Sequence, residues 1–308
     1  DDAVLVRFRP DGTLDERFGK GGVVETDYGS RDDRGGQVVA LADGGALTVG
    51  IRCEPCGGHR LAPTHYGIVV VHHGVDGRQL RKQQIDVGAQ RDFPTRLARA
   101  PDGGLVIGGY TSSRQPAPGT SYDLFAARLG PDLSLDTGFG ERGYRVVDLG
   151  GDEIGWALAV APDGKILLGG HSELGRVASP AVVRLTRAGA LDESFGGGRG
   201  SVVLRRREGE LQLYGLHALA DGAVVGTGFA RAGGDAQATL ALVRLTAAGA
   251  ADVGAWPPDG TRLFRAGKGE SLLGTSALAP DGRLVLVGYL SSADEGGAAE
   301  VVAARVWP

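Results

Sequence analysis

LAVAPDGKILLGG (158–170) is one of five similar segments of this chain, in which small and apolar residues lead into Asp-Gly and a second apolar run follows. Asp-Gly between two apolar runs is typical of a β-hairpin, so each segment predicts two short strands and the tight turn between them. The other copies are VVALADGGALTVG (38–50), LARAPDGGLVIGG (97–109), LHALADGAVVGTG (216–228) and SALAPDGRLVLVG (276–288). Their aspartates follow one another at intervals of 59, 61, 58 and 60 residues. A fixed period of this length indicates one supersecondary unit that is used five times.

A second recurring segment lies between the hairpins. Its copies are AVLVRFRPDGTLDERFGKGG (3–22), FAARLGPDLSLDTGFGERG (125–143) and AVVRLTRAGALDESFGGGRG (181–200), with weaker copies at 68–80 and 240–256 and a partial copy at 300–308. The apolar run that leads into Pro-Asp-Gly or Ala-Gly predicts a third strand and a turn. A fourth short strand, such as YRVVDL (144–149), is expected after Phe-Gly.

These four strands per unit predict the fold class. Helix signals with a 3.6-residue period are missing, so we expect an all-β protein. Four antiparallel strands at a sixty-residue period favour a five-bladed β-propeller of four-stranded blades, because radial repetition protects the sheet edges. We expect a single domain over residues 1–308. Its repeats are placed at approximately 36–87, 94–148, 154–206, 213–265 and 273–308 plus 1–27.

The two ends of the chain do not divide evenly into units. The chain begins with a third and a fourth strand and ends with a first, second and third strand. We expect the termini to close one blade, with residues 273–306 supplying three strands and residues of about 20–27 the fourth. One copy of the third strand, at 1–8 or 299–306, is then surplus. It either lies outside the ring or pairs with another chain, which would give strand-mediated self-association.

The motif Val-Arg-Phe-x-Pro-Asp-Gly-x-Leu-Asp-x-x-Phe-Gly-x-Gly-Gly, with Ala-Pro-Asp-Gly-Lys-Ile-Leu-Leu-Gly-Gly, resembles the bacterial delta-60 repeat over essentially the whole chain. Two units depart from it. His72 replaces the arginine of the second unit, which also lacks the Leu-Asp-x-x-Phe-Gly segment, and Trp256 stands where the fourth unit should have phenylalanine. The resemblance implies an exported, propeller-like protein and implies no common activity.

Composition restricts the partners. A formal net charge of −4 offers no basic surface for nucleic acid, and no apolar run approaches the length of a spanning helix, so we expect neither nucleic-acid binding nor membrane insertion. The sequence contains no methionine, even at position 1. We interpret this as a removed signal peptide, and therefore expect export to the periplasm, the cell surface or the medium. The alternative is that the first residue reflects the choice of expressed segment.

Cys53 and Cys56 are the two cysteines, and both lie in an expected loop. In an exported chain a short-range disulfide is the expected pairing. The alternative is a zinc site that adds His59 and His65, because two thiolates and two imidazoles complete a tetrahedral site. Free thiols are a third alternative.

Two recurring sets are candidates for ligand binding. Acidic residues precede four of the five Asp-Gly aspartates by eleven positions, at Asp32, Asp152, Glu210 and Glu270, and Arg91 takes this place in the second unit. A ring of such carboxylates could hold calcium or a cationic ligand, or could cap the turns that enter the first strands. The second strands end in Tyr110, His171, Phe229 and Tyr289. Beside carboxylates, these side chains could bind a sugar or a peptide, or could pack under the neighbouring loops.

Other repeat positions are expected to be structural. The first strand is rich in small residues and is therefore placed nearest the axis, with Gln37, Arg96 and His217 as polar members of a central channel, either functional or simply solvated. Equivalent arginines and aspartates, such as Arg184 and Asp192, suggest ion pairs between blades or capped turns. The phenylalanines Phe18, Phe139 and Phe195 are expected in the core between blades. We expect the Asp-Gly turns to be scaffold, on the face opposite the acidic and aromatic residues.

The sequence lacks the motifs of nucleophilic catalysis, metalloproteases and phosphate loops. We therefore expect a non-catalytic binding or scaffold module without a cofactor, for a protein partner or a surface glycan, alone or within a cell-surface assembly. The alternative is a propeller-type polysaccharide hydrolase or lyase. It would use carboxylates of the acidic set as acid and base, about 5–10 Å apart.

Overall fold

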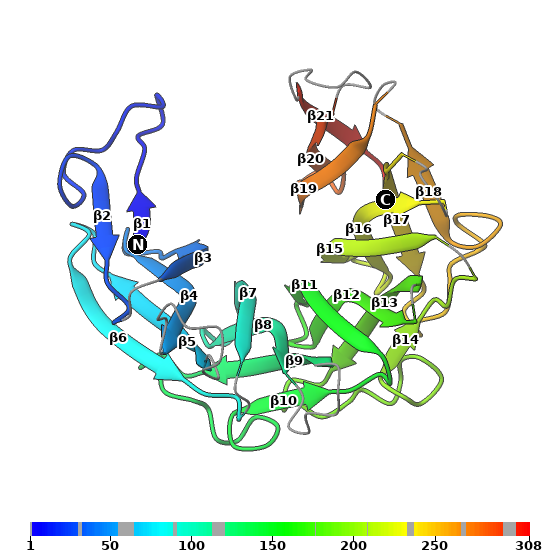
Figure 1. Ribbon diagram of the computed structural model, residues 1–308, viewed down its shortest axis with the longest axis horizontal. Coiled ribbons are helices and arrows are strands. Elements are labelled where there is room, and N and C mark those ends of the chain that lie inside the picture. Colours follow the sequence, from blue (N-terminus) through cyan, green and yellow to red (C-terminus); the bar gives the residue numbers. More distant parts are fainter. Residues whose placement is uncertain are drawn as a thin grey trace. The chain divides into compact units, whose positions relative to one another are not determined.

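The computed structural model describes residues 2–29, 33–54, 65–88, 91–112, 121–175, 177–207, 209–232, 237–265, 269–291 and 300–308. The chain forms two compact units, Asp1–Val146 and Val147–Pro308, and each is described by itself. Every regular element in these ranges is a β-strand (Figure 1), which confirms the all-β prediction. A helix long and apolar enough to cross a membrane is not found in the described part of the chain.

The first unit contains two four-stranded antiparallel sheets and one two-stranded sheet. One sheet consists of β3 (Arg34–Ala40), β4 (Ala46–Glu54), β5 (His65–His73) and β6 (Gln79–Ile85). The next consists of β7 (Asp92–Arg99), β8 (Leu105–Ser112), β9 (Tyr122–Leu129) and β10 (Tyr144–Val147). The two-stranded sheet pairs β1 (Ala3–Val6) with β2 (Val23–Thr26).

The second unit contains two further four-stranded sheets and a three-stranded one. The strands of the first are β11 (Asp152–Val160), β12 (Ile166–Leu174), β13 (Val177–Leu185) and β14 (Ser201–Val203). Those of the second are β15 (Glu210–Ala218), β16 (Val224–Arg231), β17 (Thr239–Leu245) and β18 (Thr261–Phe264). The third has β19 (Ser271–Leu278), β20 (Leu284–Leu290) and β21 (Glu300–Val306). The predicted order of four strands is thus confirmed in four sheets.

The strands at the two ends of the chain pair locally. β2, which was expected as the fourth strand of the last blade, hydrogen-bonds to β1. β21 has β20 as its one hydrogen-bonded neighbour among the strands that the structure describes. A turn within residues 7–22 brings β1 and β2 together, and short loops cost little entropy to close. The five-blade count and the closure by both termini stay predictions.

The Asp-Gly turns have the geometry that the sequence predicts. In the β11–β12 hairpin the Gly164 amide donates to the Ala161 carbonyl over 2.9 Å, and Asp163 Oδ1 accepts the Lys165 amide over 3.0 Å. Gly164 has a φ of 83°, in the left-handed region that favours glycine. Ala161 also donates to the Lys165 carbonyl over 2.8 Å, so residues 162–164 form a three-residue hairpin loop that ends in a left-handed glycine, a common type.

Sheets such as β3–β6 bury residues of both their faces. Ile68, Val69, Val70 and Val71 of β5 are all fully buried, although alternate side chains of a strand point to opposite faces. Ile68 and Val70 pack in one cluster with residues of β7–β9, whereas Val69 and Val71 pack in another with Ala3 of β1. A sheet of this kind is stable only between two neighbours. The predicted core phenylalanines, Phe18, Phe139 and Phe195, are at most 1% exposed, and Trp256 is 2% exposed.

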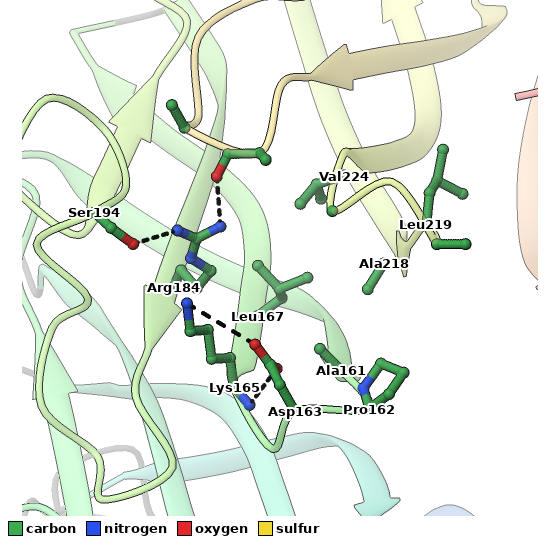
Figure 2. A pocket seen from close by; sticks show the side chains of 14 residues that line it. Ala161, Pro162, Asp163, Lys165, Leu167, Arg184, Ser194, Ala218, Leu219 and Val224 are labelled. Carbon is green, nitrogen blue, oxygen red and sulfur yellow. Dashed lines mark hydrogen bonds and ion pairs between the residues drawn. The ribbon is translucent and has the colours of Figure 1, made fainter.

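The repeated arginines and aspartates pair within one repeat. Arg184 Nε lies 2.7 Å from Asp192 Oδ2, and the same guanidinium reaches the neighbouring sheet by donating to the Ala247 carbonyl (Figure 2). Equivalent pairs are Arg7–Asp15 at 3.0 Å, Arg128–Asp136 at 3.0 Å and Arg244–Asp252 at 2.8 Å. The ion pair therefore fixes the turn of its own repeat, and a hydrogen bond to a carbonyl makes the link between sheets.

One junction between sheets replaces an apolar contact by a polar one. Between the β11–β14 and β15–β18 sheets, Leu216 lies directly over Gly169, where a Cβ atom would be 2.6 Å from its Cδ1. At the next junction Ser276 takes the repeat position of Leu216, and Thr227 takes that of Gly169. The Ser276 hydroxyl lies 2.6 Å from Thr227 Oγ1 and 2.8 Å from His217 Nε2.

His217 in turn takes the repeat position of Ala159. Burial lowers its pKa to about 4, so the imidazole is neutral near neutral pH. The small Ser276 side chain and the larger His217 and Thr227 side chains thus fill the same space as the leucine, alanine and glycine of the preceding junction.

We expect Ser276→Leu to destabilise the protein by roughly 1–3 kcal/mol, because Thr227 and His217 already occupy the space that a leucine would need. Adding His217→Ala and Thr227→Gly should restore most of this loss, since the triple variant copies the Leu216 junction. Urea unfolding of the native protein, Ser276→Leu and the triple variant measures the free energy of unfolding of each. A triple variant as unstable as Ser276→Leu alone would contradict the packing described.

Candidate binding surface

Alternate residues at the start of β15 lie on one side of the strand. Leu211 and Leu213 are buried in the core, whereas Glu210, Gln212 and Tyr214 are half-buried. This is the two-residue alternation of a strand that has one face in the core. The cross-strand partners on β16 are Arg231 for Glu210 and Phe229 for Gln212.

A chain of hydrogen bonds and ion pairs joins five polar side chains here. The Tyr214 hydroxyl donates to Gln212 Oε1 over 3.3 Å, and Gln212 Nε2 donates to Glu210 Oε2 over 2.9 Å. Arg231 then lies between two carboxylates, with Nη1 3.2 Å from Glu210 Oε1 and Nη2 3.0 Å from Glu270 Oε1. Two of the predicted acidic residues are therefore brought together by an arginine that the sequence analysis did not select.

Aromatic rings stack beside this network. The Trp156 ring of β11 lies 5.8 Å from that of Tyr214 at an interplanar angle of 15°, and Phe229 continues the stack at 5.8 Å. Burial raises the pKa of Tyr214, with smaller contributions from Glu210 and Tyr289. Tyr289 itself is 43% exposed. We call Trp156, Glu210, Gln212, Tyr214, Phe229, Arg231 and Glu270 the β15 surface.

His171 and Asp152, also predicted, adjoin the β15 surface. His171 is 7% exposed on β12, and burial lowers its pKa against the opposing fields of Glu210 and Asp152. Its Nδ1 atom has no hydrogen-bond partner among the described residues. Among the predicted aromatic set, His171 and Phe229 are thus mostly buried, and Tyr289 alone of these three presents a large exposed ring.

Tyr110 belongs to a second aromatic cluster, in the first unit. Its ring stacks on Phe93 at 4.9 Å and meets Tyr122 edge-on at 5.3 Å, while Tyr66 approaches Phe93 at 5.2 Å. Burial raises the pKa of Tyr110. Of the polar residues predicted for a channel, Arg96 donates to the Thr95 carbonyl, and Gln37 lines a small pocket with residues of β1 and β2. Their placement in a channel stays a prediction.

The acidic residues next to the predicted ring have a structural role. Asp33, Asp92 and Glu153 are nearly or fully buried at the entry to β3, β7 and β11. Each accepts a backbone amide of the preceding loop, from Tyr28 at 2.6 Å, Val87 at 3.3 Å and Leu149 at 3.2 Å. These carboxylates cap the turns, which is the alternative that the sequence left open for the acidic pattern.

The dependence of stability on pH tests whether the Asp92 carboxyl is buried in this turn. Burial raises its pKa to about 6 against hydrogen bonds from Thr111 and Val87. The folded state therefore binds a proton that the unfolded state releases near pH 4, so stability should fall as the pH rises from 4 to 7. The loss is about 3 kcal/mol. Chemical unfolding at several pH values should show this slope in the native protein and a flatter profile in Asp92→Asn. Equal slopes in the two proteins would contradict the buried, protonated carboxyl.

Several predicted ligands lie outside the described residues, namely Asp32, Cys56 and His59. Cys53 is 3% exposed and lies opposite Tyr66 in the β4–β5 pairing, and His65 begins β5. The disulfide and the alternative zinc site therefore stay predictions.

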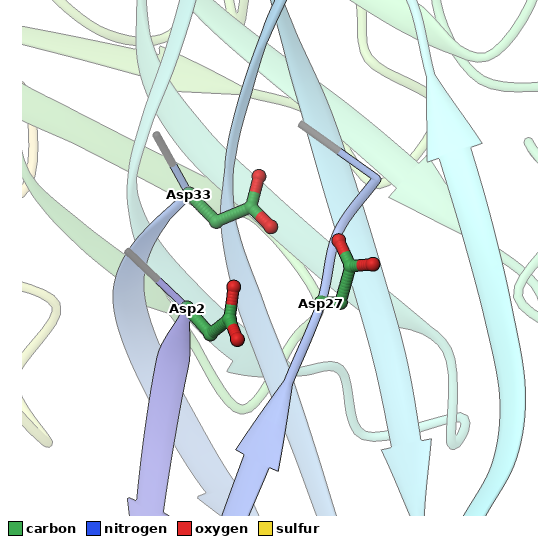
Figure 3. Close-up of side chains that lie close together, drawn as sticks. All are labelled: Asp2, Asp27 and Asp33. Atoms are coloured by element: carbon green, nitrogen blue, oxygen red, sulfur yellow. The ribbon is translucent and has the colours of Figure 1, made fainter. Parts of the chain in front are cut away.

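The structure also gathers carboxylates that the sequence analysis did not select. Asp2, Asp27 and Asp33 offer ligand atoms within 4.8 Å of one another (Figure 3). Asp2 and Asp27 are exposed, and Asp33 already accepts the Tyr28 amide. Acidic residues at the same repeat positions, Asp123, Asp148 and Glu153, were a signal in the sequence. We assign no metal to this group, because exposed carboxylates commonly lie close together without an ion.

A family model for a β-propeller domain of unknown function (DUF5122) matches residues 100–139 and 161–195. Each matched segment begins just before Pro-Asp-Gly and ends at a buried phenylalanine, so these units are repeats of the β-propeller kind. The match supports the propeller fold, and it is not specific to the delta-60 repeat. A search of curated proteins gave no match.

Solved structures that match this chain include three enzymes. A luciferin-regenerating enzyme is 11% identical, with 89% of this chain and 91% of that chain covered and a TM-score of 0.43. An endo-arabinanase from Bacillus licheniformis is 13% identical, with 87% and 91% covered and a TM-score of 0.41. A mannose phosphorylase from Leishmania mexicana is 14% identical, with 82% and 78% covered and a TM-score of 0.42. Similarities this distant carry no conclusion about function.

Proposed function

We propose that this chain is a non-catalytic β-propeller module that binds a glycan through the β15 surface. The single observation that supports this proposal is the network from Tyr214 to Glu270, which runs along a stack of aromatic rings. Sugars present both an apolar ring face and hydroxyl groups, and aromatic side chains beside hydrogen-bonding groups match both. A protein partner is the other ligand that such a surface could take.

The geometry of Glu210 and Glu270 favours binding over hydrolysis. A glycosidase needs one carboxyl group that carries a proton and a second that is ionised. Here one guanidinium bridges both carboxylates, so the two groups face the same partner instead of two different environments. The pair is therefore arranged to accept hydroxyl hydrogens and is not divided into an acid and a base. The hydrolase or lyase is kept as the alternative function.

Binding to a panel of soluble polysaccharides, measured by affinity electrophoresis, tests the proposal. We expect at least one polysaccharide to retard the native protein, and Tyr214→Ala and Arg231→Ala each to weaken that binding at least tenfold. Trp307→Ala is the matched control, because Trp307 is 66% exposed and contacts Arg283, at the opposite end of the β19–β20 hairpin from Glu270. Equal loss in the control, or retardation by none of the polysaccharides, would contradict the proposal.

The same polysaccharides distinguish the binding module from the alternative function, a hydrolase or lyase. Release of new reducing ends by the native protein, abolished in Glu210→Gln, would indicate the hydrolase. A binding module leaves chain length unchanged, and Glu210→Gln then alters affinity alone.

We propose further that the module is exported, works without a cofactor and has five blades closed within one chain. The sixty-residue period supports the five blades, and the delta-60 resemblance supports export. Closure by its own termini predicts a particle of 31.7 kDa in light scattering. A multiple of that mass would instead indicate strand pairing between chains.

A further inference from the structure

A pocket of about 570 Å³ lies between the β11–β14 and β15–β18 sheets, at the end of the strands opposite the β15 surface. The two Asp-Gly hairpins, 161–165 and 218–224, form part of its wall, so these turns are more than the scaffold expected from the sequence. Ala247 and Ala248 of the turn after β17 line it as well. Its size is within the range of small-molecule sites.

The pocket exists because these repeat positions are small here. Where this turn has Ala247 and Ala248, the equivalent turns have Pro131 and Asp132, or Val75 and Asp76. Ala220 likewise stands where three other hairpins have proline. Larger side chains at these places would fill the space between the sheets.

The two sides of the pocket differ in chemistry (Figure 2). Ala161, Pro162, Ala218, Leu219 and Val224 form an apolar side. The other side has Asp163, Lys165, Arg184 and Ser194. Arg184 is 8% exposed, so a buried charge faces a mainly apolar space.

The cations of the polar side retain hydrogen-bond donors. A guanidinium has five N–H groups and an ammonium three. Arg184 donates to Asp192, Ala247 and Ser194 over 2.7–2.9 Å, and the Lys165 ammonium lies 3.1 Å from Asp192. Asp192 also accepts the Ser194 amide and hydroxyl, so its acceptor sites are in use. Asp163, at 3.9 Å from Lys165, lies beyond hydrogen-bond distance.

This arrangement is particular to one sheet. In three others the arginine pairs with the aspartate of its own hairpin turn, as Arg128–Asp102, Arg244–Asp221 and Arg305–Asp281. In the β11–β14 sheet Arg184 keeps its pair with Asp192, which Lys165 shares, and its Nη2 atom donates to Ser194 instead of the aspartate of the hairpin turn. Arg184 and Lys165 both line the pocket, so a ligand there can reach the donors that these pairs leave over.

We propose that this pocket binds an apolar monocarboxylate, a ligand that joins one aliphatic group to one carboxylate. The aliphatic group packs against the alanine, proline, leucine and valine side, and the carboxylate accepts from Lys165 and Arg184. A single negative charge suits the site, because Asp163 and Asp192 lie close by and would repel a doubly charged group such as phosphate. A sugar would leave its hydroxyl groups unpaired against the apolar side.

Such a ligand has two sources, a free small acid or the C-terminal residue of a peptide. N-acetyl-leucine and N-acetyl-leucinamide are suitable probes, since they differ in the carboxylate alone. Calorimetry should show the acid to bind at least tenfold more tightly than the amide. A tetrapeptide ending in leucine that binds at least tenfold more tightly than N-acetyl-leucine identifies a peptide terminus, and a weaker or equal affinity identifies a free acid.

Two variants locate the site. Lys165→Met should reduce the affinity for the acid to that for the amide. Ala248→Asp places a carboxylate at a position where other repeats carry Asp76 and Asp132, so the fold accommodates it, and it should compete with the ligand for the same donors. Ala188→Asp is the matched control at the same repeat position of the preceding turn, which does not line the pocket, and should bind normally.

Thermal unfolding of each variant shows that it is folded before binding is compared. Equal binding of acid and amide by the native protein overturns the proposal. So does full binding by Ala248→Asp, or the absence of binding by either probe. None of these outcomes bears on the β15 surface, which lies at the other end of the same strands.

Discussion

The fold depends on sheets that are apolar on both faces. Four consecutive residues of β5, Ile68 to Val71, are fully buried and divide alternately between two clusters. In the second unit Val224 and Val225 of β16 divide in the same way. A single sheet of this composition would expose one apolar face, so each repeat needs a neighbour on either side. The close packing between neighbouring sheets also restricts which side chains fit. At the Leu216 junction one large side chain faces small ones, and at the Ser276 junction one small side chain faces larger ones, in the same volume.

Because packing between sheets buries the strands along most of their length, the candidate binding sites lie at the strand ends. The start of β15 and the end of β16 carry the β15 surface, with its ion pairs and stacked rings. The other ends of these strands carry the hairpin turns and the apolar pocket. The repeated arginine pairs with the aspartate of the following turn in several repeats. In the β11–β14 sheet it makes the same pair and also lines a cavity. Small changes at repeated positions therefore produce sites without altering the scaffold.

The repeat allowed the strand order, the turns and the buried phenylalanines to be predicted, because these depend on local alternation and turn chemistry. The repeated arginines and aspartates were expected to form ion pairs between blades or to cap turns, whereas the structure pairs them within a repeat. For the candidate site, Glu210, Glu270 and Phe229 were selected, whereas Arg231 and Tyr214 were not. Neither residue recurs at its repeat position, so a search for repeated residues passes over both. Lys165, which lines the pocket, was passed over for the same reason.

The sequence by itself determined where the strands and hairpin turns lie, because the two-residue alternation of side chains and the left-handed glycines act over a few residues. The repeated segments could likewise be counted from the sequence. Tertiary structure alone decided which side chains of different repeats meet. Glu210 and Glu270 are sixty residues apart and share one arginine because two sheets stack. The pocket likewise depends on the distance between two sheets, which the summed sizes of facing side chains set. Contacts of this kind have no local signature, and they are where the proposed binding chemistry lies.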